Sequence, residues 1–498
     1  MDKYQKNRYP NREMTQLNTT TKSRAITGML WSSGGSFAFQ IIRIVTQIIL
    51  ARLLWPEAFG TVALAMAFVT VVNYLIDNGL TLYYIRQNES GDFDNFTLLI
   101  SNVVLATLSI IFFALLAPLL SQSFGLEIFS SVLIYSSIAI LLNALGTVHK
   151  ASLTREIQFK TQTLYLLISA IVSGLIAVIS AMFGIGLWSL VIYNVSYQLI
   201  SSVLLIFGVK LDFKIGFDYK FFRSAFVFSW KLMLSGLIHT LYENTLNVMM
   251  ANLFSVSALG YYSNALKIRD GAAQTLSDSI QKVSFPVLSK IKDNQEALKF
   301  NSSKILRLSI FIIFPILIGL AASSDAIIRV VFNEQWIGMI PIMQVLAING
   351  LLIPLHKVNL NILTVVGRTD LYLKLEVFKK VIAFSTLGLV LFMQVNLITL
   401  LWLLFINAVI GYLANVYYSG NLIDYGFKNQ FLDIRNIVLV GIAMGIVVYG
   451  FSLLNIHPVW ILGIQLLSGV IIYIVLSYKF CRIEYDEVLS LMLKLIKR

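Results

Sequence analysis

Long apolar segments recur along the chain from residue 25 to residue 478 and are separated by short polar segments. A helix that crosses the hydrocarbon core of a bilayer needs about 20 mostly apolar residues. The pattern predicts an all-α integral membrane protein with fourteen transmembrane helices. They are expected near residues 25–50, 57–78, 96–120, 128–149, 163–183, 186–208, 222–250, 258–286, 303–322, 338–366, 371–393, 396–420, 434–454 and 458–478.

The eighth predicted helix is exceptional because it is rich in charge. It contains Lys267, Arg269, Asp270, Asp278 and Lys282. Loop parity nevertheless supports it. With a cytoplasmic N-terminus, strict alternation puts most Lys and Arg, including those at 374, 379 and 380, into inside segments, as the positive-inside rule expects. The predicted outside loops at 121–127, 184–185, 251–257, 394–395 and 455–457 contain no Lys or Arg, and the one at 323–337 contains only Arg329. Omitting the eighth helix would invert every later loop.

An internal repeat gives independent support. The segment ARLLWPEAFGTVALA at 51–65 matches ANLFSVSALGYYSNA at 251–265 at five positions, among them Gly60 and Gly260. A weaker echo relates GLWSLVIYNV from Gly186 to TLLWLLFINAV from Thr399. Transporters are often built from such repeats, with the substrate site between them. We therefore expect a cytoplasmic tail (1–23), two six-helix lobes (24–209 and 222–420), an extra helix pair (434–478) and a cytoplasmic amphipathic tail (479–498).

Composition narrows the class of protein further. Only 13% of residues are charged and 57% are hydrophobic, with a mean hydropathy of +0.79, whereas soluble domains carry about 25% charged residues. This excludes a soluble multidomain enzyme and a disordered chain, and the single cysteine, Cys481, excludes an intrachain disulfide. The net charge of +13 is explained by the inside segments, so no nucleic-acid partner is expected.

Polar residues form stripes on two predicted helices. In the first helix they are Ser32, Ser36, Gln40, Arg43 and Gln47, at steps of three or four residues that share one face. In the seventh they are Lys231, Ser235, His239, Glu243 and Asn247. A charge at the bilayer centre costs about 2.5–3.5 kcal/mol, so such groups are expected to face protein or a watery cavity. The alternative is that the stripes only hold helices together.

Cations outnumber acids among the charges expected near mid-membrane. Arg43, Lys231, Lys267 and Arg269 oppose Glu243 and Asp270. This bias suits an anionic headgroup such as a phosphate, which arginine binds through two parallel hydrogen bonds. The predicted pyrophosphate and glycan site comprises Arg43, Lys267, Arg269, Lys231, Lys357, Gln40 and Gln47. Two alternatives stay open: the eighth helix could neutralise its own charges, and Lys357 could snorkel to the interface.

A second set of residues is expected to form a cavity network or to couple transport to H⁺ or Na⁺. It comprises His239, Glu243, Asp270 and Asn247. The sequence has no H-E-x-x-H, G-x-S-x-G, CxxC or GxxxxGK[ST] motif, and its predicted loops are short. We therefore expect no catalytic residues, metal site or cofactor, and a protein that is not an enzyme.

An ordered set of motifs resembles a known family. The set comprises ARLLWPEAFGTVALA from Ala51, DNGL from Asp77, LTREIQFK from Leu153, GIGLWSLV from Gly184, ALGYYSNALKIRD from Ala258, VSFPVLSKIKD from Val283 and NEQWIGMIPIMQVLA from Asn333. Together they resemble the polysaccharide biosynthesis family of lipid-linked oligosaccharide flippases, within the multidrug/oligosaccharidyl-lipid/polysaccharide exporter superfamily.

The resemblance implies a MATE-like pair of six-helix bundles in the bacterial inner membrane with both termini cytoplasmic. It implies alternating access that carries an undecaprenyl-pyrophosphate-linked oligosaccharide to the outer leaflet, with membrane lipid and polysaccharide polymerase machinery as partners. Two other functions remain open, a cation-coupled multidrug exporter of the same fold and a membrane polysaccharide polymerase. The multidrug lineage typically has a coupling acid in its early helices, and the first predicted helix has none, which favours the flippase.

Overall fold

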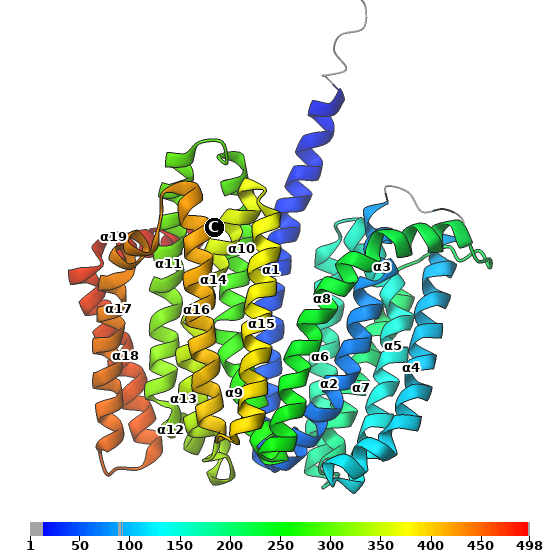
Figure 1. Ribbon diagram of the computed structural model, residues 1–498, viewed down its shortest axis with the longest axis horizontal. Helices are drawn as coiled ribbons and strands as arrows, with labels where there is room; N and C mark the ends of the chain where they lie inside the picture. The colour runs from blue at the N-terminus through cyan, green and yellow to red at the C-terminus, as the bar shows by residue number, and fades with distance from the viewer. Residues whose placement is uncertain (1–12, 88–90, 92, 497–498) are drawn as a thin grey trace, which may run out of the picture.

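The computed structural model describes residues 13–87, 91 and 93–496, and this part of the chain is entirely helical (Figure 1). The α-helices are α1 (Glu13–Leu53), α2 (Pro56–Asn78), α3 (Leu80–Arg86), α4 (Asp94–Phe124), α5 (Glu127–Arg155), α6 (Phe159–Met182), α7 (Trp188–Gly208), α8 (Tyr219–Leu253), α9 (Val256–Ala272), α10 (Gln274–Lys290), α11 (Gln295–Ala322), α12 (Ser324–Ile327), α13 (Met339–Gly350), α14 (Leu352–Val366), α15 (Thr369–Met393), α16 (Leu397–Ile423), α17 (Phe427–Gly450), α18 (Pro458–Phe480) and α19 (Arg482–Ile496). Short helical turns of other types cover Ile328–Phe332, Glu334–Trp336 and Phe451–Leu453.

Helices occupy all fourteen predicted ranges, but not all of them have the composition of a membrane span. Eleven segments of the described chain are long and apolar enough to cross a bilayer, and the two halves of α8 would together make a twelfth. The α9–α10 pair and α15 fall outside this set. These helices contain several charged residues. The number of fourteen transmembrane helices therefore stays a prediction.

Three helices differ from their predicted form. Helix α1 begins at Glu13, so residues 13–23 of the predicted tail are helical, while residues 1–12 lie outside the described residues. The predicted eighth helix is two helices that meet at Ala273, and the tenth is two that meet at Leu351. Pro354 follows the second break in the first turn of α14, where a missing backbone N–H is tolerated.

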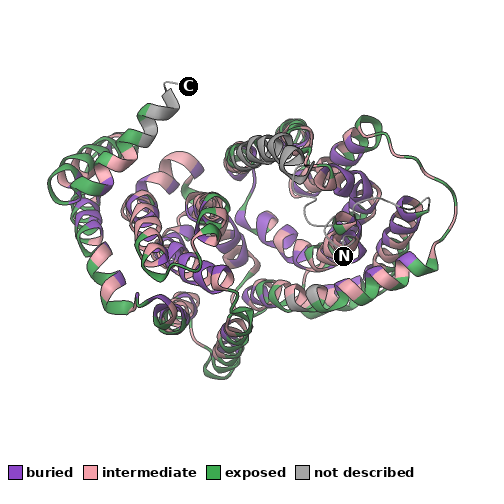
Figure 2. Cartoon of the chain, turned by 90° about the horizontal axis from the view of Figure 1, so that it is seen from above, coloured by how far each residue is buried: buried purple, intermediate pink, exposed green. Residues whose placement is uncertain are grey.

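The helices form two groups that lie side by side (Figure 2). Helices α1, α2 and α4–α7 pack against one another, and α9–α11, α13, α14 and α16 form the second group, with α15 against α14 and α16. Helices α17 and α18 pair with each other, and α17 packs on α11. Helix α19 is held against α11 by ion pairs Arg307–Glu484 (3.0 Å) and Lys304–Glu487, so the predicted amphipathic tail contacts its own chain.

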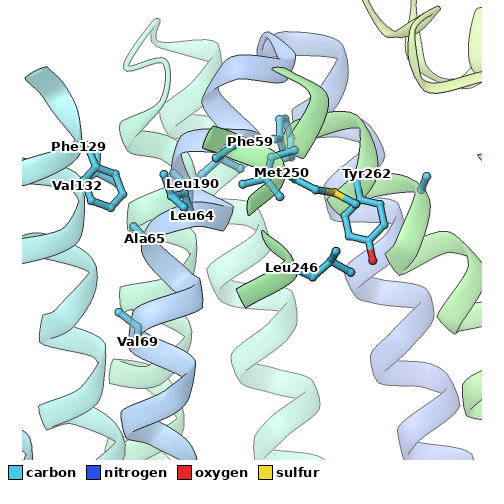
Figure 3. Close-up of a cluster of buried hydrophobic side chains, with 14 of the residues drawn as sticks. Phe59, Leu64, Ala65, Val69, Phe129, Val132, Leu190, Leu246, Met250 and Tyr262 are labelled. Carbon is cyan, nitrogen blue, oxygen red and sulfur yellow. The ribbon is translucent and has the colours of Figure 1, made fainter. Parts of the chain in front are cut away.

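The two ends of the molecule differ in charge and packing. We call the end with the connections 209–218, 291–294 and 424–426 the basic end, and the other the turn end; the basic end is uppermost in Figure 1. At the turn end, α2 packs closely on α8 and α9. Figure 3 shows the buried side chains there, including Phe59, Leu190, Met250 and Tyr262 from four helices. The two groups are thus joined by an apolar core at the turn end.

Candidate substrate cavity

Two cavities follow the inner side of α1. The larger has a volume of about 890 Å³ and lies between α1, α6, α10 and α14, toward the basic end. Its lining includes Ser36 and Gln40 of α1, Gln162 of α6, and Asp278 and Lys282 of α10. Because its lining comes from both groups of helices, the cavity is a space between the groups, in which these polar side chains lie among apolar ones.

The second cavity is deeper and smaller, about 300 Å³, and we call it the central cavity. Arg43 and Gln47 of α1 line it, together with Asn247 of α8 and Lys267 and Asp270 of α9. Arg43 is one helical turn beyond Gln40, so the central cavity continues the larger one toward the turn end. Both polar stripes expected from the sequence therefore contribute to this space.

Hydrogen bonds fix the position of α1 against α9 beside this cavity. Gln40 donates through Nε2 to the carbonyl oxygen of Lys267 at 3.2 Å. About two turns further along, Gln47 donates to Oδ1 of Asn264. These contacts hold the backbone near Arg43 and Lys267 in register, so two cations from different groups of helices face one space.

Arg43 and Lys267 have no ion pair among the described residues. The guanidinium carbon of Arg43 lies 5.6 Å from the ring centre of Phe39, a cation–π contact. The one carboxylate in the lining, Asp270, accepts hydrogen bonds from Arg269, the shorter at 2.6 Å. The central cavity therefore carries an excess of positive charge.

A third cavity, of about 320 Å³, lies among α8, α9, α13, α14, α15 and α16. Its charged lining residues are Glu243, Arg269, Glu376, Lys379 and Lys380, and Asn349, His356 and Asn407 add polar groups. Lys379 pairs with Glu376 on the same face of α15. Arg269 links the third cavity to the central one, because it lines the former and pairs with Asp270 of the latter.

The predicted site residues are therefore divided. Arg43, Gln47, Asn247, Lys267 and Asp270 line the central cavity, Gln40 lines the larger one, and Glu243 and Arg269 line the third. The side chains of Ser32 and Ser235 lie outside the described residues.

Three predicted residues lie away from the cavities or at their edges. Lys231 is exposed at the bend of α8, with its ammonium 5.6 Å from the ring of Trp230. His239 is largely exposed and lies between Lys380, at 3.1 Å from Nδ1, and Glu243, at 3.9 Å. Lys357 pairs with Asp278, so its partner rather than the lysine lines the larger cavity.

Sequence reasoning missed Lys379 and Lys380 as cavity residues, because it counted them among the inside segments. They lie near the middle of α15 and line the third cavity. The spacing of Glu376 and Lys379 was the available signal, since residues three apart on a helix can pair. Tyr193 and Asn194 of α7 were missed as well, although an Asn within an otherwise apolar helix is unusual.

Metal-ligand chemistry has no candidate in the part of the chain that the structure describes, where no three His, Cys, Asp or Glu side chains come together. What the geometry offers is charge and hydrogen bonding inside a helical membrane protein. Two groups of helices that enclose polar cavities define a multi-pass membrane transporter fold.

Comparison with known proteins identifies the family. Residues 49–341 match the polysaccharide biosynthesis protein family, and the chain belongs to it. It is 24% identical over 462 residues to the teichuronic acid biosynthesis protein TuaB of Bacillus subtilis, covering 91% of this chain and 95% of that protein. It is 26% identical over 373 residues to the lipopolysaccharide biosynthesis protein WzxC of Escherichia coli, covering 72% and 73%.

Solved structures agree with the expected fold. The lipid II flippase MurJ in an inward closed conformation matches with a TM-score of 0.72 at 18% identity, over 91% of this chain and 99% of that one. An inward-facing multidrug resistance MATE family transporter of the MOP superfamily matches with a TM-score of 0.61 at 13% identity, over 77% and 95%. The predicted family and the fold type are confirmed, as is the location as a multi-pass protein of the bacterial inner membrane.

Proposed function

We propose that this protein is a flippase for a lipid-linked oligosaccharide, and that the lipid is undecaprenyl pyrophosphate. Arg43 and Lys267, which line the central cavity and have no ion pair with a described residue, carry this proposal. A pyrophosphate brings several anionic oxygens to one place, and two cations from different helices can bind them together. Two comparisons support this function. The relatives are named as teichuronic acid and lipopolysaccharide biosynthesis proteins, and the fold is similar to that of a lipid II flippase.

The larger cavity suits the glycan. Its lining supplies amides and hydroxyls, among them Gln40, Gln162, Thr163 and Asn361, which match the hydroxyl groups of sugars. The polyprenyl chain, which is wholly apolar, remains in the lipid between the two groups of helices. In this proposal the headgroup alone enters the protein.

The transport cycle in this proposal is alternating access of two six-helix lobes, residues 24–209 and 222–420. All fourteen helical segments cross the membrane, with the basic end and both termini in the cytoplasm, as the distribution of Lys and Arg suggests. The large cavity toward the basic end and the packed turn end then correspond to a state that receives substrate from the cytoplasmic side. Rocking of the lobes exposes the same cations to the outer leaflet.

The test replaces each cation in cells that lack the chromosomal copy of the gene. Arg43→Ala and Lys267→Ala are expected to abolish surface polysaccharide and to accumulate the lipid-linked unit in the cytoplasmic leaflet. Arg43→Lys and Lys267→Arg are expected to retain partial transport. Lys428→Ala, which removes an exposed lysine at the start of α17, is the matched control. Normal polysaccharide with well-expressed Arg43→Ala and Lys267→Ala proteins contradicts the proposal.

The main rival is a cation-coupled exporter of small molecules, which would need a free carboxylate in a cavity. Asp270 is paired with Arg269, and Glu376 is paired with Lys379. The remaining acid of the third cavity, among the described residues, is Glu243, which lies beside His239. We propose that Glu243 and His239 couple transport to H⁺ or Na⁺. Altered drug resistance with unchanged surface polysaccharide on gene deletion would favour the exporter. Formation of glycosidic bonds by the purified protein would instead support the alternative function of a polysaccharide polymerase.

A further inference from the structure

At the turn end, the connection between α12 and α13 contacts the end of α1. We call residues 328–338 the α12–α13 connection. Arg52, in the last turn of α1, donates through Nε to the carbonyl oxygen of Val331 at 2.8 Å and through Nη2 to that of Val330. The last carbonyl groups of a helical turn have no partner within it. Here their partner is an arginine from the other group of helices.

The carbonyl oxygens in the last turn of α1 have their partners in the same connection. Trp336 donates through Nε1 to the carbonyl oxygen of Ala51 at 2.8 Å, and Asn333 donates to that of Arg52 at 3.4 Å. A longer α1 would give the Arg52 carbonyl the N–H of residue 56, but Pro56 has none. Each group of helices therefore supplies side-chain donors for main-chain acceptors of the other.

Trp336 lies in an aromatic pocket to which both groups of helices contribute. Its ring centre is 5.2 Å from that of Phe59 on α2, 5.8 Å from that of Tyr261 on α9 and 5.5 Å from that of Phe332. The side chain is 0% exposed. A buried indole N–H usually needs a hydrogen-bond partner. Movement of α1 away from the connection would leave this N–H unpaired, so the position of Trp336 depends on α1.

The connection is also braced within its own group of helices. Arg329, the one basic residue of the predicted outside loop at 323–337, pairs with Asp325 of α12 at 3.0 Å and with Glu334 at 3.1 Å. Neither ion pair involves α1. Both can therefore persist when α1 moves away, so that the connection keeps its form.

The contacts between the connection and α1 are of a kind that can open and form again. They are hydrogen bonds near the surface, where the Arg52 side chain is exposed, so water can replace each partner after separation. Helical turns of the π type are rare and occur frequently at functional sites. One of them, Ile328–Phe332, contains both acceptors for Arg52.

We propose that the α12–α13 connection is a gate that keeps the turn end closed. Its hydrogen bonds with α1 set how often this end opens, and opening moves Trp336 out of its aromatic pocket. This gate rests on the alternating access of the proposed function, because the lobes must separate at the turn end to expose the central cavity to the outer leaflet. Its opening requires no particular substrate, so the protein alone can report it.

The experiment measures how often the end of α1 becomes accessible. In a Cys481→Ser background, Ala51→Cys places the only thiol at a side chain that is 0% exposed and whose carbonyl accepts from Trp336. Purified full-length protein in detergent is mixed with a water-soluble maleimide, and the labelling rate reports the open fraction. No substrate is present. A wrong substrate assignment, which Arg43→Ala and Lys267→Ala test in cells, would leave this result unchanged.

We expect variants of the gate to be labelled faster. Trp336→Phe keeps an aromatic ring but lacks the N–H, and should raise the labelling rate about fivefold, the loss of one hydrogen bond. Arg52→Ala removes two charge-assisted hydrogen bonds and should raise it about tenfold or more. Trp460→Phe, which alters a 69% exposed tryptophan of α18, and Arg368→Ala at the basic end are the matched controls, and should leave the rate unchanged.

Low concentrations of denaturant separate opening of the gate from unfolding of the protein. Opening exposes less surface than unfolding does, so labelling through the gate should depend only weakly on denaturant, whereas labelling through unfolding rises steeply. Labelling of both Trp336→Phe and Arg52→Ala at the rates of their controls would overturn the gate. Faster labelling with a steep dependence on denaturant would assign the accessibility to unfolding and would overturn it as well.

Discussion

Gly60 and Gly260 occupy equivalent places on the two sides of one helix contact. A methyl group at Gly60 would lie 1.8 Å from the carbonyl oxygen of Val256, and one at Gly260 would lie 2.1 Å from that of Pro56. Pro56 and Val256 occupy matching positions of the two repeat segments, as the glycines do. Each repeat segment thus supplies the glycine that admits the backbone of the other, and the sequence repeat is a structural pair at the turn end.

Substitution of either glycine should loosen the turn end. Gly60→Leu forces α2 and α9 apart because the obstacle is backbone, and overpacking of this kind costs about 1–3 kcal/mol. We expect transport to fall and the turn end to open. In a Cys481→Ser background, cysteines placed at Glu57 and Ser257, whose side chains hydrogen-bond, report the separation by disulfide cross-linking.

The control for this prediction is Gly463→Leu on α18, where a side chain meets no atom within 4 Å. Cross-linking as efficient in Gly60→Leu as in the unsubstituted glycine background would show that α2 and α9 need not approach so closely.

Arg269 should affect the central cavity without lining it. Arg269→Ala releases the carboxylate of Asp270, which lies in the same cavity as Lys267 and would compete with an anionic substrate. A charge-assisted hydrogen bond is worth about 1.5–3 kcal/mol, so we expect transport to fall about tenfold or more. The double substitution Arg269→Ala/Asp270→Asn should recover most of it. Failure of the double variant to recover, at normal protein levels, would instead indicate that Arg269 itself binds substrate.

The contact between α19 and α11 should contribute to stability. The Arg307 and Glu484 side chains are 21% and 10% exposed, so breaking the pair leaves a poorly solvated charge. Glu484→Gln should lower the free energy of unfolding by about 1–3 kcal/mol. Asp486→Asn breaks the exposed Arg482–Asp486 pair of the same helix and should cost about 1 kcal/mol or less. Equal thermal unfolding of the two variants would show that burial of the Arg307–Glu484 pair adds nothing.

The positions of the helices could be predicted from the sequence, since every predicted range contains helix. Hydrophobic patterning was enough for most of them, and the charged eighth also needed the distribution of Lys and Arg and the internal repeat. The helix breaks at Ala273 and Leu351 could not be predicted, because the residue pattern around each break is the same as that expected for one continuous helix. The cavity residues were predicted in part. Arg43 and Lys267 do face one space, because the stripe of α1 and the polar side of α9 meet there.

Which cavity each charge faces depended on packing between distant helices. Lys267 and Arg269 are two residues apart and therefore point to opposite sides of α9. The sequence could not show that a second polar space lies on the far side of α9. That space is formed partly by α15, whose lysines were counted with the inside segments. Arg269 pairs with Asp270, its neighbour in the sequence, so α9 neutralises part of its own charge, one of the alternatives that the sequence left open.

The charged composition of α15 has a consequence for biogenesis. With Glu376, Lys379 and Lys380 near its middle, this helix would enter the bilayer unfavourably by itself, since each central charge costs about 2.5–3.5 kcal/mol. Its neighbours α8, α14 and α16 supply the polar surface that offsets this cost. If α15 crosses the membrane as proposed, its insertion is coupled to the arrival of helices made before and after it, and a nascent chain that ends within α15 should remain open to quality-control proteolysis.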